Sequence, residues 1–339
     1  MTDPVVLLDQ QGTAQREYRA TLTQAAEAIR SAARCGETVA LACHITPDGD
    51  ALGSMLGLLH VLRSAGIDAM ASFSEPFVIA THYRELVGLE LISHPSSFPD
   101  TPNLMITFDC GSLGRLGDLE APARAARELV VVDHHISNER YGTINVINAD
   151  AAASGVVVRD LIAELGLPLN RESAVCLYAA IVCDTGRFQY QCTTPAVFEL
   201  ARELAEFDVP IPALSRTLFE EHRFAYLQLM ATVLQRAVLI PEQRFVYAVV
   251  MQADLVKFDV TMEEVEGLID MVRRTREAEV SSVLKQDADG TVRVSMRSLG
   301  DVDVCAIAQA NGGGGHRFAA GFSSSDGIEA TVARIRAAL

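Results

Sequence analysis

Apolar runs that each end in an acidic residue or a histidine recur along the first half of the chain. Four such runs occur: VALAC before His44, LMITF before Asp109, LVVV before Asp133, and LYAAIVC before Asp184. Continuous apolar runs rich in Val are typical of strands that are buried on both faces. In open α/β sheets, ligands bind beyond the carboxyl ends of the strands. The recurrence therefore predicts a functional site at one edge of a sheet.

The segments between these runs have the spacing of helices and further strands. Helices are predicted at Ala14–Arg34, Ala51–Ala65, Ala121–Glu128, Ala153–Leu165 and Thr194–Phe207, and a strand at Ala69–Phe73. The segment Ser173–Asp184 fits a buried helix or a strand, and its periodicity does not decide between them. Strands that alternate with helices indicate βαβ units, so we expect an α/β fold with a parallel sheet.

A second pattern begins after Pro210. Residues Leu214–Leu239 are predicted to be helical and to form a connector. The elements predicted beyond it are strands at Phe245–Met251, Glu279–Lys285 and Thr291–Arg297, and helices at Thr261–Thr275, Asp303–Ala310 and Ile328–Leu339. The sequence DADG at 287–290 suits a hairpin turn. We therefore expect an N-terminal domain at 1–213, a helical connector at 214–240 and a smaller α/β domain at 241–339.

Composition indicates a folded protein without an extended basic surface. The chain has 339 residues, of which 49% are hydrophobic and 21% charged, and its formal net charge is −16. Residues 1–240 contain 17 Arg and no Lys against 29 acidic residues, a net charge of −12. The two lysines are Lys257 and Lys285. A general grip on long nucleic acid needs a basic field, so that function is disfavoured.

Cysteine usage and the termini favour the cytoplasm. The seven cysteines are scattered, odd in number and without a CxxC pair. This pattern indicates free thiols in a reducing compartment. The first residues lack the basic and apolar regions of a signal peptide. No apolar run approaches the roughly 20 residues of a membrane-spanning helix. We expect a cytoplasmic protein without membrane contact.

The polar residues after the apolar runs form a set with the chemistry of a metal site. The set is His44, Asp48, Asp50, Asp109, Asp133, His134, His135 and Asp184. Carboxylate and imidazole groups without thiolates favour manganese, magnesium or a similar ion over structural zinc. Five converging carboxylates would repel one another unless cations lay between them. Two cations with one bridging carboxylate meet that need, and two-metal sites support in-line displacement at phosphorus. The prediction is phosphoester or phosphoanhydride hydrolysis.

Each of these residues taken alone has a simpler interpretation. A single Asp after a strand is usually a helix N-cap or a turn residue. The sequence Pro-Asp-Gly-Asp around Asp48 and Asp50 is good turn chemistry. Four such segments in succession, two of them with histidine, are harder to explain by capping. The recurrence favours a shared site.

A second candidate site lies in the last third of the chain. The glycines Gly312, Gly313, Gly314 and Gly315 would let backbone N–H groups approach an anion closely. A flexible turn is the alternative. His316 after the glycines and Arg297 after a predicted strand favour substrate binding, because the planar Arg fork suits phosphate oxygens. Ser298 and Arg187 are weaker candidates.

Five motifs together resemble one known family. HITPDGDALGS, FDCGS, VVDHH and AAIVCDTGRF resemble the four ordered motifs of the DHH phosphoesterases. NGGGGHRFAAGF resembles the glycine-rich motif of their associated C-terminal domain. The resemblance covers Val39 to Phe322. Chain length and domain order are most similar to the NrnA type, oligoribonucleases that also remove the 3′-phosphate of 3′-phosphoadenosine 5′-phosphate (pAp).

The resemblance implies a role for each motif residue. One metal would be bound by His44 and Asp48, the other by Asp50, His134 and Asp184, with Asp109 bridging both. His135 would face the scissile phosphate as hydrogen-bond donor or general acid. Asp133 would orient the histidines, although from the residues alone it could equally be a ligand. The nucleotide end would be held by Arg297, Ser298, Gly312, Gly313, Gly314, Gly315 and His316.

The expected function is that of a two-metal phosphoesterase. It would use two divalent cations, manganese first, with magnesium and cobalt as alternatives. Its substrates would be short oligoribonucleotides, linear dinucleotides such as pApA and pGpG, and pAp, bound in a cleft between the domains. The alternatives are a dedicated cyclic-dinucleotide phosphodiesterase, a related pyrophosphatase, a RecJ-type exonuclease and a non-catalytic nucleotide sensor. A sensor would be expected to lose metal ligands, and all are present.

The resemblance is compatible with a homodimer. The related pyrophosphatases carry a different, lysine-bearing second domain, and the RecJ-type enzymes usually carry additional domains. Both alternatives are therefore disfavoured.

Overall fold

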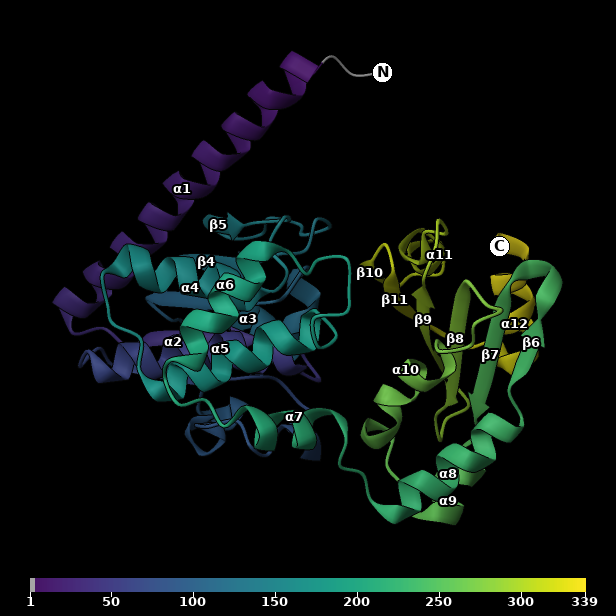
Figure 1. Cartoon of the computed structure of the whole chain (residues 1–339). Coiled ribbons are helices and arrows are strands. Elements are labelled where there is room, and N and C mark those ends of the chain that lie inside the picture. Colours follow the sequence, from purple (N-terminus) through teal and green to yellow (C-terminus); the bar gives the residue numbers. More distant parts are fainter. Residues whose placement is uncertain (1–3) are drawn as a thin grey trace. The chain divides into compact units, whose positions relative to one another are not determined.

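The computed structural model describes residues 4–339, with side chains from residue 14 onward. The chain divides into two compact units at Glu220, with residues 1–220 in the first and Glu221–Leu339 in the second (Figure 1). The division falls inside the segment expected to be a connector. The helical part of that segment is α7 (Ile211–Phe219) in the first unit and α8 (Phe224–Gln235) in the second.

The first unit is built on a parallel sheet, as the sequence predicted, and the sheet has a fifth strand, β5, that was not predicted. The strand order is β2-β1-β3-β4-β5, with bounds β1 (Val39–Cys43), β2 (Ala69–Ser72), β3 (Leu104–Phe108), β4 (Glu128–Asp133) and β5 (Ile144–Ile147). Cys43 is in register with Phe108, and Phe108 with Val132. The polar residues that follow these three strands therefore come out side by side at one edge of the sheet.

Helices cover both faces of this sheet. They are α1 (Pro4–Cys35), α2 (Gly49–Ser64), α3 (Glu120–Ala125), α4 (Ser154–Leu165), α5 (Arg171–Asp184), α6 (Pro195–Ala205) and α7, with 3₁₀ turns η1 (Thr81–Tyr83), η2 (Leu89–Leu91), η3 (Pro95–Ser97) and η4 (Leu113–Leu119). The large core lies between the sheet and α1, α2, α4 and α5, and a smaller one lies under η4 and α3. Within the described residues, no helix is long and apolar enough to cross a membrane.

The segment 173–184, which fitted either a helix or a strand, is part of helix α5. Asp184 is its last residue and so reaches the site from a helix end, unlike His44, Asp109 and Asp133. Glycines let α2 and α5 approach closely. A Cβ at Gly53 would lie 2.4 Å from the Cys176 carbonyl oxygen. This close packing sets the relative position of Asp184 and the start of α2.

The second unit contains a mixed sheet of six strands in the order β10-β11-β9-β8-β7-β6. The bounds are β6 (Val238–Ile240), β7 (Phe245–Val250), β8 (Val280–Gln286), β9 (Val292–Ser298), β10 (Gly314–His316) and β11 (Ala319–Ser324). Strands β7 and β8 are parallel, and the other neighbours are antiparallel. The predicted hairpin joins β8 and β9, where Asp287 N–H donates to Thr291 O at 2.8 Å.

Helices pack on both faces of this second sheet. They are α8, α9 (Gln252–Phe258), α10 (Ile269–Val272), α11 (Val304–Ala310) and α12 (Gly327–Ala338), with 3₁₀ turns η5 (Pro241–Gln243) and η6 (Glu263–Leu268). One core lies beneath α8, α9 and α10, and the other beneath α11 and α12. The helix expected at Thr261–Thr275 is instead η6 followed by the single turn α10. Gly267 inside this segment weakens an α-helix.

Candidate active site

His44 follows β1 and turns its imidazole toward two carboxylates. Its Nδ1 lies 2.7 Å from the carbonyl oxygen of Ile45. Its Nε2 lies 3.5 Å from Oδ2 of Asp109 and 3.9 Å from Oδ2 of Asp48. Only 3% of the residue is exposed. A ring that donates from Nδ1 to a carbonyl keeps the lone pair of Nε2 for a metal ion.

Asp48 is both a helix N-cap and a member of the candidate site, the two roles that its sequence context allowed. It is the N-cap of α2, and its Oδ1 accepts hydrogen bonds from the N–H groups of Asp50 and Ala51 at 3.1 and 3.0 Å. Its Oδ2 faces His44. One oxygen therefore caps the helix, as N-cap residues do, and the other is directed to the candidate site.

Asp50 is fully buried in the first turn of α2. Its carboxylate accepts from Ser154 N–H at 2.6 Å, Gly155 N–H at 2.9 Å and the hydroxyl of Ser54 at 3.0 Å. The first two donors are amides of the first turn of α4, which have no acceptor within the helix, and this helix end favours negative charge. Burial, with the nearby charge of Asp109, nevertheless raises the pKa of Asp50 well above its ordinary value.

Asp109 lies at the centre of the cluster. Its backbone has φ of 52° directly after β3, a left-handed conformation that Asp tolerates better than most residues. Oδ2 faces His44, while Oδ1 lies 3.6 Å from Nε2 of His134 and 3.4 Å from Nδ1 of His135. Ser154 Oγ donates to Oδ1 at 3.1 Å. Burial raises the pKa of Asp109, but the three histidines outweigh it and hold that pKa below its ordinary value.

His134 and Asp184 form the opposite side of the cluster. Nδ1 of His134 lies 3.1 Å from the carbonyl oxygen of Ala151. Its Nε2 lies 3.1 Å from Asp184, 3.6 Å from Asp109 and 3.7 Å from Asp50. Burial disfavours the charged ring, but the three carboxylates outweigh it and raise the pKa of His134. Burial also raises the pKa of Asp184.

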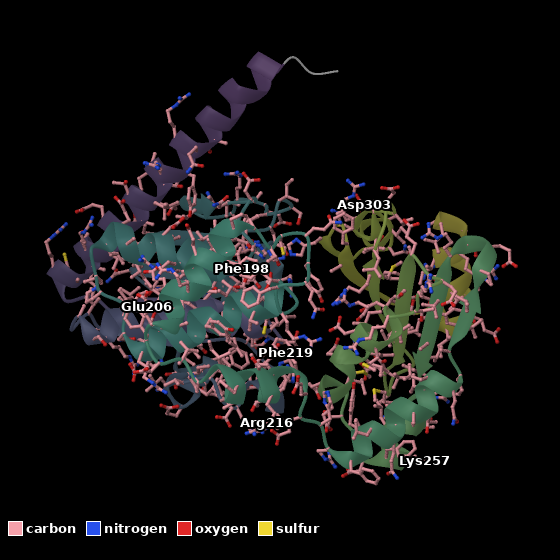
Figure 2. The ribbon with its side chains drawn as sticks, viewed as in Figure 1. Phe198, Glu206, Arg216, Phe219, Lys257 and Asp303 are labelled. Carbon is pink, nitrogen blue, oxygen red and sulfur yellow. The ribbon has the colours of Figure 1, made fainter. Side chains whose placement is uncertain are left out.

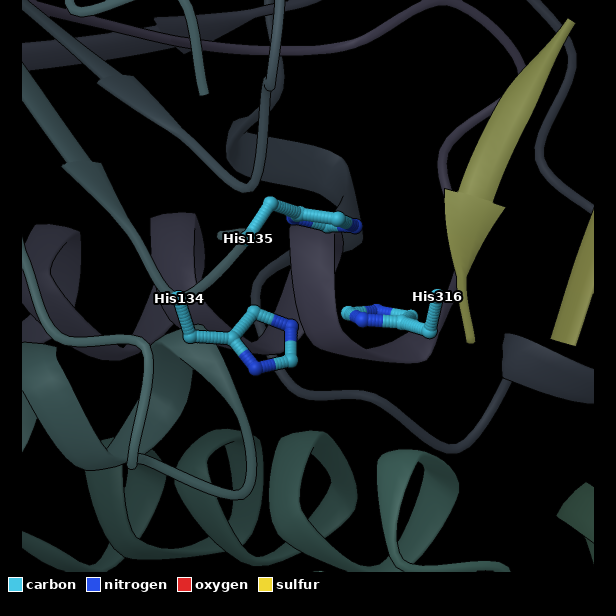
Figure 3. A group of neighbouring side chains, drawn as sticks. All are labelled: His134, His135 and His316. Carbon is cyan, nitrogen blue, oxygen red and sulfur yellow. The ribbon is translucent and has the colours of Figure 1, made fainter. Parts of the chain in front are cut away.

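Asp133 is fully buried and its oxygens bind groups of its own segment. Oδ1 accepts from the backbone N–H groups of His134 and His135 at 2.7 and 3.1 Å, and lies 2.7 Å from Nδ1 of His135. Oδ2 accepts from Asn138. Figure 3 shows His134 and His135 at the end of β4, with ring centroids 4.8 Å apart and the rings edge to face. These bonds hold the turn that presents both histidines.

The eight residues taken from the sequence come together in the first unit. Three ligand groups form, each with atoms within 4.8 Å of one another: His44, Asp48 and Asp109; Asp50, His134 and Asp184; and Asp109, Asp133, His134 and His135. Asp109 joins the first group to the third, and His134 joins the second to the third. Oxygen and nitrogen donors without thiolates fit a hard or borderline divalent cation.

Three neighbours of this cluster were not among the sequence candidates. Ser154 bonds both Asp50 and Asp109, and Asn138 bonds Asp133. Arg115 places Nη2 3.2 Å from Nδ1 of His44. In the sequence, Ser154 is marked only as a small polar residue near the start of a predicted helix. Asn138 is marked only as an amide side chain shortly after DHH. Neither signal is specific.

The substrate candidates of the second unit lie on neighbouring elements of its sheet. Arg297 is on β9, and its Nη1 donates to Met296 O at 3.0 Å. Its Nε is buried and lacks a hydrogen-bond partner among the described residues. Ser298 lies on the opposite, buried face of β9. His316 is the last residue of β10 (Figure 3).

The glycine run closes a helix and then becomes an edge strand. Gly312 N–H donates to Gln309 O at 3.0 Å, and Gly313 N–H donates to Ala308 O at 2.9 Å, at the end of α11. The amides of Gly312 and Gly313 therefore have partners at the helix end, and Gly314 and Gly315 belong to β10, in register with Gly321 and Ala320 of β11. Glycine is required for another reason as well, because a Cβ at Gly313 would lie 2.1 Å from Gly321 O.

Comparison with known proteins adds an independent line of evidence. Residues 38–181 match the model of the DHH family, N-terminal domain. Residues 242–339 match the model of the DHHA1 domain. The first match contains the whole cluster except Asp184, and the second contains Arg297 and the glycine run.

Similar proteins cover most of the chain. The bifunctional oligoribonuclease and PAP phosphatase NrnA of Thermus thermophilus is 31% identical over 83% of this chain and 82% of its own length. A probable bifunctional oligoribonuclease and PAP phosphatase NrnA of Streptococcus mutans is 29% identical, over 85% and 90%. The crystal structure of an exopolyphosphatase-related protein from Bacteroides fragilis has a TM-score of 0.85 at 21% identity, covering 94% of this chain and 95% of that one.

Proposed function

The chain belongs to the DHH family and carries a DHHA1 domain, and from this premise we propose that it hydrolyses short oligoribonucleotides and removes the 3′-phosphate of pAp. As a DHH-family member it is a phosphoesterase. The observation that carries the proposal is Asp109, whose carboxylate joins the group formed with His44 and Asp48 to the group formed with Asp133, His134 and His135. Linear dinucleotides such as pApA and pGpG would be included among the substrates.

We assign the metal ligands of this activity as follows. His44 and Asp48 would hold one divalent cation, Asp50, His134 and Asp184 the other, and Asp109 would serve both. When bound, such cations neutralise charge on the phosphate and activate water for in-line attack. Manganese is the proposed metal, with magnesium and cobalt as alternatives that the donor set also accepts.

His135 is proposed as the hydrogen-bond donor or general acid. Burial disfavours its charged form, but the bond to Asp133 and the charge of Asp109 outweigh it and raise the pKa of His135. A raised pKa favours the protonated imidazole, which is the form that can donate a proton to a leaving oxygen. Asp133 is proposed to orient this ring rather than to bind metal, which is supported by the donors already bonded to both its oxygens.

Nucleotide binding is proposed for the second unit. Arg297 is supported by its buried Nε without a described partner, because an unmet donor favours an anionic acceptor. Ser298, the run Gly312, Gly313, Gly314 and Gly315, and His316 complete the proposed set. The proposed role of Ser298 in nucleotide binding is less well supported, because this residue is buried on the other face of β9. The same holds for Gly312 and Gly313, because their N–H groups already donate to carbonyls of α11.

A short substrate is favoured by the distribution of positive charge. Lys257 lies on the surface of α9 (Figure 2), and Lys285 is buried in β8 beside Glu266. Neither forms part of a basic track, and phosphate contacts dominate the affinity for long nucleic acid. We propose a preference for oligonucleotides of about five residues or fewer.

The test is product analysis with manganese across a graded set of substrates. The set is pAp, pApA, a 5-mer RNA, a 24-mer RNA, a cyclic dinucleotide and pyrophosphate, with the Asp109→Asn variant as control. Mononucleotides from pApA and the 5-mer, and AMP with phosphate from pAp, are expected. Faster cleavage of the 24-mer than of pApA would contradict the short-substrate proposal. Turnover of the cyclic dinucleotide alone would assign the alternative phosphodiesterase function.

A further inference from the structure

Arg115 places a positive charge at the rim of the acidic cluster. It lies in η4, and its side chain is exposed. The backbone fixes it there, because Ile45 N–H donates to Arg115 O at 2.9 Å and Arg115 N–H donates to Ser112 O at 3.1 Å. Its Nη2 lies 3.2 Å from Nδ1 of His44.

The contact with His44 leaves the guanidinium donors unused. Nδ1 of His44 cannot donate to Ile45 O and accept from Arg115 at the same time. The Ile45 contact is shorter, 2.7 Å against 3.2 Å, so we place the proton on Nδ1. The guanidinium of Arg115 then has no hydrogen-bond acceptor among the described residues, and it forms no ion pair with any of them.

Two arginines that follow Arg115 in the chain have acidic partners. Arg124 pairs with Glu120, and Arg127 pairs with Glu37, each at 2.7 Å. Arg115 lies beside His44 of the acidic cluster, yet no carboxylate of the described residues forms an ion pair with it. A charged group that is fixed by its backbone and without a protein partner is available to an exogenous anion.

Arg115 lies at the same edge of the sheet as the candidate metal ligands. The residue whose N–H bonds the Arg115 carbonyl is Ile45, which directly follows His44 at the end of β1.

We propose that Arg115 binds a phosphate oxygen of the substrate. This inference rests on the proposed phosphoesterase function. The planar guanidinium stays charged and matches two oxygens of a phosphate group. Positive charge fixed near a phosphoryl group stabilises the charge that develops during its transfer. Residues 1–240 contain no lysine, so arginine alone supplies such charge in this part of the chain.

The test compares Arg115→Ala and Arg115→Lys with Arg124→Ala, an exposed arginine on the neighbouring α3. Each manganese-loaded protein is titrated with orthophosphate by calorimetry, its manganese content is measured, and kcat/KM is determined on bis(p-nitrophenyl) phosphate. Arg115→Ala should weaken phosphate binding and kcat/KM by roughly 10–100-fold. Its manganese content should match that of Arg124→Ala, and Arg115→Lys should recover part of the loss.

Two results would overturn the inference. Phosphate binding by Arg115→Ala within twofold of Arg124→Ala would show that the guanidinium does not contact the anion. A lower manganese content in Arg115→Ala would assign Arg115 to positioning His44 instead. Failure of the proposed function is separate, because it would appear as wild-type protein that does not hydrolyse the diester.

Discussion

The backbone N–H of Ser154 donates a 2.6 Å hydrogen bond to Oδ2 of Asp50, a residue 104 positions earlier in the chain. The hydroxyl of Ser154 donates a second bond, of 3.1 Å, to Oδ1 of Asp109. One residue at the start of α4 therefore holds two carboxylates, one from the first turn of α2 and one that directly follows β3. Groups that orient metal ligands in this way commonly set metal affinity.

Ser154→Ala should weaken manganese binding by roughly 10-fold, because it removes the bond to Asp109 and keeps the backbone bond to Asp50. Manganese titration with thermal unfolding of the metal-free protein measures this. Ser173→Ala is the matched control, since Ser173 is fully buried and its hydroxyl lacks a hydrogen-bond partner among the described residues. Equal metal affinity in the two variants would remove Ser154 from this role.

Asp109→Ala should abolish hydrolysis, with a loss of roughly 10³-fold or more, because it removes the carboxylate shared by the ligand groups. The metal-free variant should stay folded, since the change leaves the apolar core intact, and relief of repulsion with Asp50 offsets part of the lost contacts with the three histidines. Circular dichroism and turnover are measured together. A folded variant with near-normal turnover would refute the shared-carboxylate assignment.

Substitutions of the two adjacent histidines should affect metal binding and turnover differently. His134→Ala should lower the manganese content, because its Nε2 faces Asp184, Asp109 and Asp50. His135→Ala should keep a manganese content closer to normal while turnover falls. Metal analysis of both purified proteins tests this, and an equal loss of metal in the two would show that their roles are not separable.

Manganese affinity should rise as the pH increases from about 6 to about 8. In the metal-free protein, the pKa values of His134 and Asp50 lie above their ordinary values, so the folded state holds protons that metal must displace. The same shifts stabilise the metal-free fold below the unfolded-state pKa values, and that stability is lost as the pH rises through the folded ones.

The measurement for this prediction is the melting temperature with and without manganese across the same pH range. The rise in melting temperature caused by manganese should become larger as the pH increases. Calorimetry in two buffers should detect the protons released when manganese binds. His134→Ala serves as the control, because it removes one of the groups that must lose a proton. An increment independent of pH in the wild-type protein would contradict the proton assignment.

Arg297→Ala and His316→Ala should impair hydrolysis of pApA more than that of bis(p-nitrophenyl) phosphate, because the small diester needs no nucleotide contact. For Arg297 the expected loss on pApA is roughly 10–100-fold, in line with removal of a charge-assisted phosphate contact. Arg293→Ala is the matched control on the same strand, since Arg293 pairs with Asp287. Normal pApA turnover by both variants would show that nucleotide binding lies elsewhere.

Four of the five strands in the first sheet, and the residues that gather at its edge, could be predicted from the amino-acid sequence. Buried parallel strands require continuous apolar runs, and the residues that follow them meet at one edge of the sheet. His44, Asp109 and Asp133 could therefore be grouped without coordinates. The hairpin of the second unit was equally accessible, because its turn depends on four consecutive residues ending in Gly290.

The three-dimensional structure was needed to show which elements and contacts position these residues. Asp184 comes from a helix end, which an apolar run cannot reveal because a buried helix and a buried strand share that pattern. The bonds of Ser154 to Asp50 and Asp109, and the position of Arg115 beside His44, join residues far apart in the chain. Such contacts depend on long-range packing, whereas periodicity and turn chemistry report only on near neighbours.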